Sequence, residues 1–298
     1  MLKSFLRTRG SQEVSFWEEY FAAQSFDYLV GSFPSDPLRP LFSRYCSGGA
    51  RVLEGGCGLG NYLPSLRNLG ARVVGLDFGI DMLREVRRRE PRIPLTAGDI
   101  SALPFRDATL DVYYSGGVME HFEAGPLPLI REAHRVLRPG GILLVSVPFE
   151  NPIRRVRARR HQRLPGGILT RVVDLESISE PPAGYTFFQY FYRGREFRRH
   201  LNEHSFEVLR EQPYSLWRGL TELGPFRWLD NSYAGRKPED GTRLGGGGEH
   251  ARVWSSPWKG RLKYLMFAED RRVPLFGQLV SIGCELAANM RMYVCRRI

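Results

Sequence analysis

Features of a membrane-spanning or secreted protein are missing from this sequence. No run of about 18 apolar residues occurs, so we expect no transmembrane helix. The basic first residues lack the apolar core of a secretory signal, and a disordered tail is favoured there over a surface-lying segment. The four cysteines are scattered, with no C-x-x-C pair and no Cys/His cluster at zinc spacing. These absences predict a reduced, cytoplasmic protein without a bound metal.

Acidic residues are outnumbered by basic ones, and the net charge is +11. Nucleic acid, an anionic membrane surface or an acidic substrate are all compatible with this charge. No recognised RNA- or DNA-binding module is visible, which makes nucleic acid an unlikely partner. A basic run surrounds His161, and it can hold an anionic group of a substrate, make peripheral contact with an anionic membrane, or form a solvated helix face. The run consists of Arg154, Arg155, Arg157, Arg159, Arg160 and Arg163.

Glycine is concentrated in residues 50–62. A short aliphatic run ends in Glu54 and then breaks into glycines, a pattern typical of a buried strand, a tight turn and the start of a helix. Glycine is needed where the backbone bends at positive φ and where a ligand approaches without interference from a Cβ atom. The free N–H groups of the turn favour a polar or anionic ligand edge.

A second strand-like run ends in Asp77. An acid at this place can accept hydrogen bonds from both hydroxyls of an adenosine ribose. The G-x-G-x-G spacing alone is weak evidence, because dinucleotide enzymes carry G-x-G-x-x-G at the same point. Together, the loop and Asp77 indicate a cofactor that contains adenosine, without saying which one.

Strands alternate with helices from residue 50 to about residue 147. This alternation predicts right-handed βαβ crossovers and a doubly wound α/β sheet, with ligands at the carboxyl ends of the strands. Two helices are expected before the first strand, one through Trp17 and one from Ser35 or Asp36 to about residue 46 with Pro37 in its first turn. They either roof the cofactor pocket or only cover a sheet edge.

The motifs of this region resemble those of class I S-adenosylmethionine (SAM)-dependent methyltransferases, especially the small-molecule, quinone and natural-product types. The segments are LEGGCGLG (53–60), VVGLD (73–77), AGDI (97–100), SGGVMEHF (115–122) and RVLRPGG (135–141). The likeness covers residues 50–147 and resumes weakly at 196–209 and in the terminal strand. It implies a Rossmann-like, seven-stranded sheet of order 3-2-1-4-5-7-6 in which strand 7 is antiparallel.

The resemblance also implies SAM as the cofactor, S-adenosyl-L-homocysteine as the product, and roles for individual residues. Glu54 is expected at the methionyl amino end, Asp77 at the ribose, and Asp99 at the adenine amino group. Met82 either packs on the adenine or only fills the core. The full set of expected cofactor-binding residues is Glu54, Gly56, Gly58, Gly60, Asp77, Phe78, Met82, Asp99, Ile100 and Ser115.

His121 and Glu120 are the candidate catalytic residues, because they follow the fourth strand where it opens into the expected site. A neutral imidazole there can take a proton from a hydroxyl or amine acceptor. The other interpretation is that His121 caps a helix or shapes the pocket. Glu120 can pair with His121, or with a metal as in some relatives of the family, although no second metal ligand is evident.

Two irregular segments rich in aromatic residues lie where the family carries substrate lids, which predicts a small, partly apolar acceptor methylated on O, N or C. An isoprenoid, lipid-linked or phosphorylated acceptor would explain both the aromatic residues and the arginines. A satellite hydrophobic cluster or an oligomer interface is the competing explanation, and the oligomeric state is not predicted. The alternative function is methylation of a peptide terminus or RNA docked on the basic surface.

Six parts are predicted along the chain. They are an N-terminal helical cap (1–48), the SAM-binding core (49–148), a lid insertion (149–193), a core helix with strand 6 (194–212), a second lid or insertion (213–274) and a final helix with strand 7 (275–298).

Overall fold

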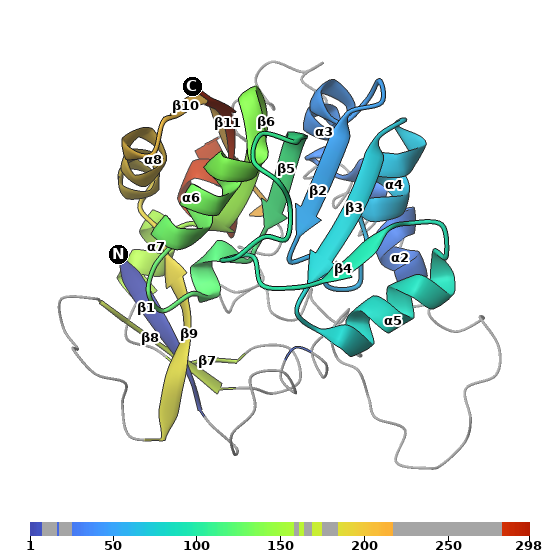
Figure 1. The fold of residues 1–298 in the computed structure, drawn as a ribbon. Helices are drawn as coiled ribbons and strands as arrows, with labels where there is room; N and C mark the ends of the chain where they lie inside the picture. The colour runs from blue at the N-terminus through green and yellow to red at the C-terminus, as the bar shows by residue number, and fades with distance from the viewer. Residues whose placement is uncertain (8–16, 18–25, 158–160, 164–168, 175–183, 217–281) are drawn as a thin grey trace, which may run out of the picture.

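The computed structural model describes residues 1–7, 17, 26–157, 161–163, 169–174, 184–216 and 282–298. Its centre is a seven-stranded sheet (Figure 1). The strands of this sheet are β2 (Arg51–Gly55), β3 (Arg72–Asp77), β4 (Leu95–Ala97), β5 (Leu110–Gly116), β6 (Leu137–Pro148), β10 (Phe206–Tyr214) and β11 (Met290–Arg297).

The order of these strands is β10-β11-β6-β5-β2-β3-β4. Strands β4, β3, β2, β5 and β6 are parallel neighbours, whereas β11 runs antiparallel to both β6 and β10. Counted from β2 along the chain, this is the order 3-2-1-4-5-7-6 with an antiparallel strand 7. The predicted doubly wound α/β fold is therefore confirmed.

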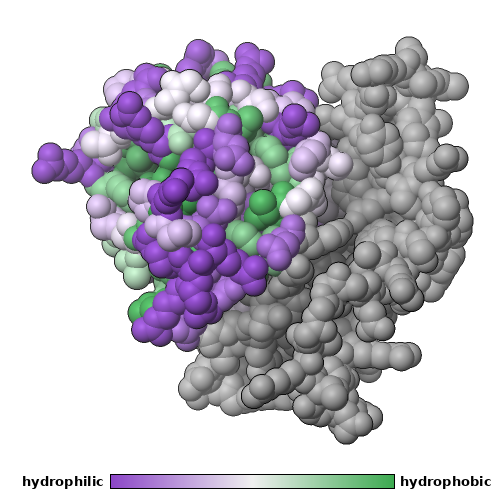
Figure 2. Space-filling model, turned by 90° about the vertical axis from the view of Figure 1, so that its right-hand side faces the viewer, coloured by the Kyte–Doolittle hydropathy of each residue, from purple (hydrophilic) through white to green (hydrophobic). Residues whose placement is uncertain are grey.

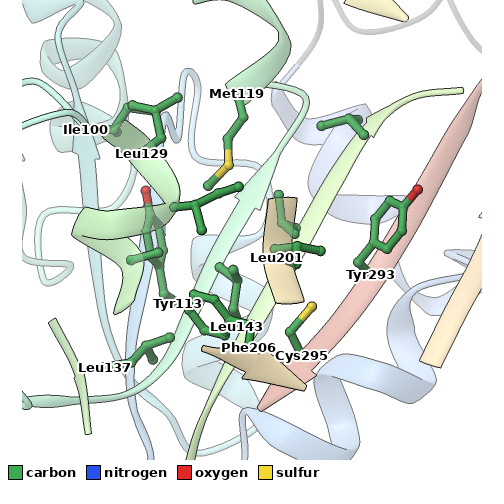
Figure 3. Packing of buried hydrophobic residues seen from close by; sticks show 14 of the residues in the cluster. Ile100, Tyr113, Met119, Leu129, Leu137, Leu143, Leu201, Phe206, Tyr293 and Cys295 are labelled. Carbon is green, nitrogen blue, oxygen red and sulfur yellow. The ribbon is translucent and has the colours of Figure 1, made fainter. Parts of the chain in front are cut away.

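Helices cover both faces of the sheet, as parallel strands require. On one face, residues of α6 (Leu127–Val136) and α8 (Gly194–Glu203) share one core cluster with sheet residues such as Leu53 and Tyr113; Figure 3 shows part of this cluster. On the other face, helices pack against the strand residues that alternate with these, such as Val52 and Val112. The helices of that second face are α3 (Arg39–Tyr45), α4 (Leu63–Asn68) and α5 (Ile80–Arg89).

A second, four-stranded antiparallel sheet lies beside the lower end of the first one (Figure 1). Its order is β7-β8-β1-β9. Its strands are β1 (Leu2–Arg7), β7 (His161–Arg163), β8 (Leu169–Asp174) and β9 (Tyr185–Phe191). The expected disordered tail is thus wrong for residues 2–7, because β1 pairs with β8 on one side and β9 on the other.

The segment before the glycine loop also differs from the prediction. A 3-10 turn, η1 (Phe33–Ser35), is followed by α3, which begins at Arg39 with Pro40 in its first turn. Asp36 accepts a hydrogen bond from the Leu38 N–H (2.7 Å), which closes a turn where the helix was expected to start. A short helix, α2 (Phe26–Gly31), precedes η1.

The helix predicted through Trp17 lies outside the described residues, apart from Trp17 itself, which is helical. So does most of the predicted insertion at 213–274 and the beginning of the final helix, of which residues 282–287 are seen as helix. None of the helices in the described part is long and apolar enough to cross a membrane. Figure 2 shows that the described surface on one side of the molecule is mostly hydrophilic, with small hydrophobic patches.

Arg154, the first residue of the basic run, is built into the fold rather than placed on a solvated helix face, whereas Arg155 is exposed. Arg154, on α7 (Pro152–Arg157), is 4% exposed and donates to the carbonyls of Phe149 and Asn289. Its guanidinium also lies over the Phe191 ring, 4.3 Å from the centroid. Phe191 belongs to β9 of the four-stranded sheet, and Asn289 directly precedes β11 of the seven-stranded sheet. Arg154 therefore links the two sheets.

Candidate active site

The glycine loop after β2 has the backbone that its sequence requires. Gly56, Gly58 and Gly60 all have positive φ, at +71°, +51° and +64°, a conformation that other residues adopt only at a cost. A Cβ atom on Gly56 would lie 2.5 Å from a methyl group of Val118. The loop therefore fits closely beneath the segment that follows β5.

The carboxylate of Asp77 fixes this loop to the end of β3. One oxygen accepts the N–H of Gly58 and the other accepts the N–H of Gly79, both at 2.8 Å. Burial raises the pKa of Asp77, while these backbone hydrogen bonds act in the opposite direction. A carboxylate has about four lone-pair sites, so Asp77 keeps acceptor capacity for the hydroxyls of a ligand.

Glu54 lies at the carboxyl end of β2 and is 4% exposed. Its Oε2 has no hydrogen-bond partner within the described residues. Burial, and then the neighbouring Asp77, raise the pKa of Glu54 well above its usual range. A buried carboxyl group with an unused oxygen, beside a second buried carboxylate, is suited to a positively charged ligand.

The tip of β4 joins the same edge. The N–H of Gly98 donates to the Asp77 carbonyl at 3.0 Å. Asp99 is exposed and accepts the Ser101 N–H through Oδ1, whereas Ile100 is buried in the core. At the end of β3, Phe78 is 52% exposed.

Two further predicted cofactor residues are buried. Met82 is 5% exposed on α5, and Ser115 is fully buried near the end of β5. Of the ten predicted cofactor residues, Gly56, Gly58 and Gly60 form the glycine loop, and Glu54 and Asp77 lie beside it. The other five lie at the neighbouring strand ends or on α5.

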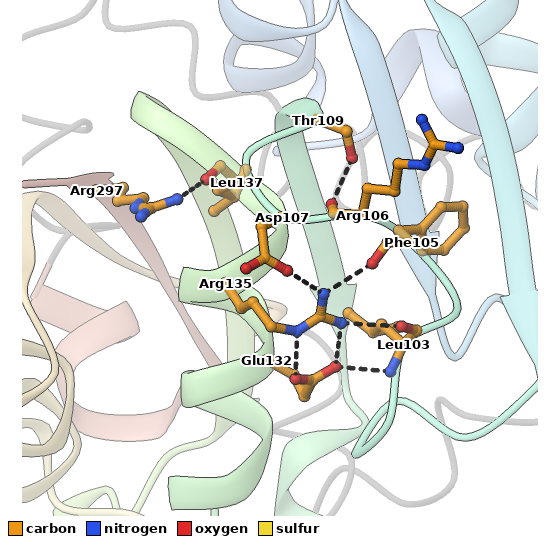
Figure 4. A network of polar contacts seen from close by, with 9 residues as sticks. All are labelled: Leu103, Phe105, Arg106, Asp107, Thr109, Glu132, Arg135, Leu137 and Arg297. Atoms are coloured by element: carbon orange, nitrogen blue, oxygen red, sulfur yellow. Dashed lines mark hydrogen bonds and ion pairs between the residues drawn. The ribbon is translucent and has the colours of Figure 1, made fainter.

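A network on α6 holds the loop between β4 and β5 (Figure 4). Arg135 donates to the carbonyls of Leu103 and Phe105 at 2.9 and 2.8 Å, and Glu132 accepts the Leu103 N–H at 2.7 Å. Arg135 also pairs with Glu132 and with Asp107. The segment that carries Asp99 and Ile100 is thereby pinned to the helix that covers the sheet.

Glu120 and His121 lie in a 3-10 turn, η2 (Met119–His121), directly after β5. Glu120 is 2% exposed, and burial raises its pKa to about 8, so it is neutral at pH 7. Its Oε1 is 3.8 Å from His121 Nε2, beyond the reach of a direct hydrogen bond. The structure therefore brings the two candidate catalytic residues together without an ion pair between them.

His121 is held by the lid segment. Its Nδ1 is 2.8 Å from the carbonyl oxygen of Phe188 in β9. A carbonyl oxygen only accepts, so Nδ1 carries the proton and Nε2 presents a lone pair. Burial lowers the pKa of His121 to about 4, which keeps the ring neutral at pH 7.

Two aromatic rings enclose this imidazole. The Trp17 ring meets it edge-on with 4.7 Å between centroids, and the Phe188 ring lies at 4.9 Å. Neither residue was named as a site residue, although the helix through Trp17 was considered as a roof of the pocket and Phe188 lies in the expected lid insertion. The motif around His121 does not indicate them, because they come from distant segments of the chain.

The other predicted features of the site concern metal and cysteine. Within the described residues, no group of three or more His, Cys, Asp or Glu side chains could hold a metal ion. Cys57 is buried inside the glycine loop, and burial raises the pKa of its thiol well above the usual value, in agreement with packing rather than catalysis.

The fold and the site define a Rossmann-like nucleotide-binding protein, because an open parallel sheet carries a glycine loop and acidic residues at its carboxyl edge. Comparison with known proteins narrows this class. The family of methyltransferase domains matches residues 53–145, and this part of the chain is a class I SAM-dependent methyltransferase domain.

Similar proteins include a probable SAM-dependent methyltransferase of Mycolicibacterium smegmatis, 40% identical over 100 residues, or 34% of this chain and 38% of that protein. A malonyl-[acyl-carrier protein] O-methyltransferase of Erwinia pyrifoliae is 35% identical over 143 residues, 46% of this chain and 54% of that one. A demethylmenaquinone methyltransferase of Renibacterium salmoninarum is 36% identical over 143 residues, 47% and 57% of the two chains. The matches thus span between about a third and three fifths of these relatives.

A solved SAM-dependent methyltransferase from Mesorhizobium loti shares the fold with a TM-score of 0.52 at 17% identity. The alignment covers 89% of this chain and all of that one. SAM is the cofactor of the family, and the residues present fit it. The unused oxygen of Glu54, the carboxylate of Asp77 and the open backbone of the glycine loop suit a cationic nucleoside.

Proposed function

We propose that this protein transfers a methyl group from SAM to a small, partly apolar acceptor. The observation that carries the proposal is the buried pair of carboxyl groups at the glycine loop, Glu54 and Asp77, whose pKa values are both raised. When bound, SAM supplies the electrophilic methyl group and a sulfonium charge. The protein supplies the charge complement and the alignment of the reacting groups.

In this proposal Glu54 binds the methionyl ammonium and Asp77 the ribose hydroxyls, while Asp99 and Ile100 face the adenine. Phe78, Met82 and Ser115 are assigned to the wall of the same pocket. His121 is the general base and Glu120 its uncharged neighbour. The surface of residues 149–193 that contains β9 is the acceptor lid, because its Phe188 carbonyl reaches the base.

The relatives suggest two kinds of acceptor chemistry. One is named for malonyl-[acyl-carrier protein] and the other for demethylmenaquinone. For this chain, the macromolecular alternative has less support from the basic run. Arg154 is buried between the two sheets and cannot contribute to a docking surface, whereas Arg155 is exposed and pairs with Glu150.

Proton linkage tests the cofactor assignment. Because a cation lowers the pKa of nearby carboxyl groups, we expect SAM binding to release protons. S-adenosylhomocysteine should release fewer protons, because it keeps the ammonium group but lacks the sulfonium charge. Isothermal titration calorimetry in two buffers of different ionisation enthalpy measures this difference.

Glu54→Gln removes the charge at nearly constant size. It should weaken SAM binding by about 1.5–3 kcal/mol, the contribution of a hydrogen bond to a charged group, and reduce the proton release. Glu207→Gln, on the exposed side of β10, is the matched control and should change neither. Absence of SAM binding by the unaltered protein would overturn the proposal.

A further inference from the structure

The environment of His121 restricts the acceptor, provided that the proposed function holds. His121 Nε2 is the ring nitrogen left without a proton, and 17% of the side chain surface remains exposed. Glu120 is too far away to occupy this lone pair directly. The base is thus positioned to receive a proton from a bound molecule.

Negatively charged acceptors find little to bind them at this place. Arg154 is engaged with Phe149 and Asn289, and both Arg155 and Arg193 donate to the buried carboxylate of Glu150. These three are the arginines of residues 149–193 whose side chains the structure describes. A carboxylate or phosphate at the reacting end would be desolvated beside Glu120, and none of these three arginines would be free to compensate its charge.

The wall around the base is aromatic and uncharged. Trp17 and Phe188 are roughly parallel, with an interplanar angle of 28° and centroids 6.1 Å apart. Among the described residues, the titratable side chains beside η2 include Glu120, Tyr190 and Tyr192, and the Lys3 ammonium lies over the Tyr190 ring, 5.4 Å from its centroid. Burial raises the pKa of both tyrosines, so they are neutral at pH 7. The Tyr190 hydroxyl donates to the Glu123 carbonyl at 2.7 Å.

We propose that the acceptor is a planar aromatic molecule with a neutral hydroxyl group, and that His121 Nε2 takes the proton of this hydroxyl during methyl transfer. The O–H bond breaks and its electron pair stays on oxygen, which forms the bond to the methyl carbon. The pair of the broken carbon–sulfur bond goes to sulfur, whose charge is neutralised. The imidazolium then returns the proton to solvent through its exposed edge.

Phe188 acts in this step as a positioning residue, through its carbonyl. It selects the tautomer in which Nε2 is the base, so the lid strand is part of the catalytic arrangement. Carboxylate acceptors are disfavoured, since they are already ionised at pH 7 and use no base.

Binding is tested without the cofactor by 15N NMR of histidine-labelled protein, with 2-naphthol and 2-naphthoate as probes that share a ring and differ in the reacting group. His121→Asn assigns the His121 signals. We expect 2-naphthol to shift the Nε2 resonance and 2-naphthoate to bind at least about tenfold more weakly. Equal or tighter binding of the carboxylate, or a protonated Nε2 in the free protein at pH 7, would overturn the proposal.

Activity is tested with His121→Asn and 2-naphthol. The variant should lose about 10²–10⁴-fold in rate at pH 7 and recover as the pH approaches about 10, where a phenol ionises unaided. His204→Asn, at the end of α8, is the control. A loss that is the same at all pH values, methylation on a ring carbon, or preferred methylation of 2-naphthoate contradicts the proposal. Failure of the protein to bind SAM in calorimetry would instead contradict the proposed function, and the NMR shift would still report on the acceptor site.

Discussion

Glu54 and Asp77 are held by the backbone of adjacent strands and of the loop between them, whereas His121 is held by segments that are far from it in the sequence. On the cofactor side, Asp77 accepts N–H groups from Gly58 and Gly79. On the acceptor side, His121 depends on the Phe188 carbonyl, 67 residues later, and on the ring of Trp17. The cofactor side is therefore a local structure, and the acceptor side exists only once both sheets have assembled.

This difference agrees with what each side has to recognise. A cofactor shared by a whole family can be bound by one strand–turn–helix unit, in which hydrogen bonds come from the backbone. An acceptor that differs among relatives needs side chains on elements that vary independently of that unit. In the proposed function, the four-stranded sheet supplies these elements.

Two glycines on opposite sides of the site provide the largest expected contrast. Gly56 and Gly117 have almost the same φ, +71° and +73°, but a Cβ on Gly56 would lie 2.5 Å from Val118, whereas one on Gly117 would meet nothing closer than 3.5 Å. The left-handed backbone costs an alanine about 1–2 kcal/mol at either place. Overpacking adds about 1–3 kcal/mol at Gly56 alone.

We therefore expect Gly56→Ala to lower the free energy of unfolding by about 2–5 kcal/mol, against about 1–2 kcal/mol for Gly117→Ala. Urea denaturation followed by circular dichroism measures both. Equal losses would show that the cofactor loop is no more tightly packed than the acceptor side.

Glu120 gives a second test, because its titration changes the stability of the protein in a pH range in which His121 does not titrate. Its pKa is raised to about 8 from 4.5, so its contribution to stability is complete below pH 4.5 and is lost as the pH rises through 8. The pKa of His121 is lowered to about 4 from 6.5, so its contribution is complete above pH 6.5 and is lost on acidification. The two oppose each other between pH 4.5 and 6.5, and only Glu120 acts from 6.5 to 8.

Glu120→Gln should accordingly flatten the decline in stability between pH 6.5 and 8. The difference from the unaltered protein is expected to be about 2 kcal/mol at most, at 1.36 kcal/mol per pH unit. Urea denaturation at pH 6.5, 7.2 and 8.0 measures it. Glu54 also titrates upward and remains in both proteins, so it cancels in the comparison. Parallel pH profiles would mean that Glu120 is ionised in the folded protein.

The sheet and the glycine loop could be predicted from the sequence because their signals are local. The seven-stranded sheet follows from alternating strands and helices, and the loop follows from glycines that must adopt positive φ. The four-stranded sheet could not be predicted in this way. Strand β1 has basic residues typical of a tail, and its partners lie more than 160 residues away. Short β-strands of this kind are specified by pairing rather than by their own pattern.

The same reasoning applies within the site. Glu54, Asp77 and the loop glycines could be named because each lies at the carboxyl end of a strand or directly after it. Trp17 and Phe188 could not, since only tertiary structure brings them to His121. Three roles were expected for the basic run: holding an anionic substrate group, contacting a membrane or facing solvent. The sequence carried no signal for burial of its first arginine. Arg154 is buried because its partners are backbone carbonyls, which leave no trace in the sequence.

Arg135 offers the smallest and most specific test of the cofactor side, because it acts on the β4–β5 connection without touching the glycine loop. Its planar guanidinium reaches the Leu103 and Phe105 carbonyls together with Glu132 (Figure 4). Lysine keeps the charge but cannot match this fork. Arg135→Lys should therefore lower the free energy of unfolding by about 1–2 kcal/mol, and weaken SAM binding by a smaller amount through the displaced Asp99–Ile100 segment. The matched control is Arg84→Lys. Its ion-pair partner among the described residues is the exposed Asp81, so its effect should be too small to measure. If calorimetry finds unchanged SAM affinity but the protein is less stable, Asp99 and Ile100 lie outside the adenine pocket. If SAM affinity is weaker while the NMR response of His121 to 2-naphthol is unchanged, the cofactor side and the acceptor side are energetically separate.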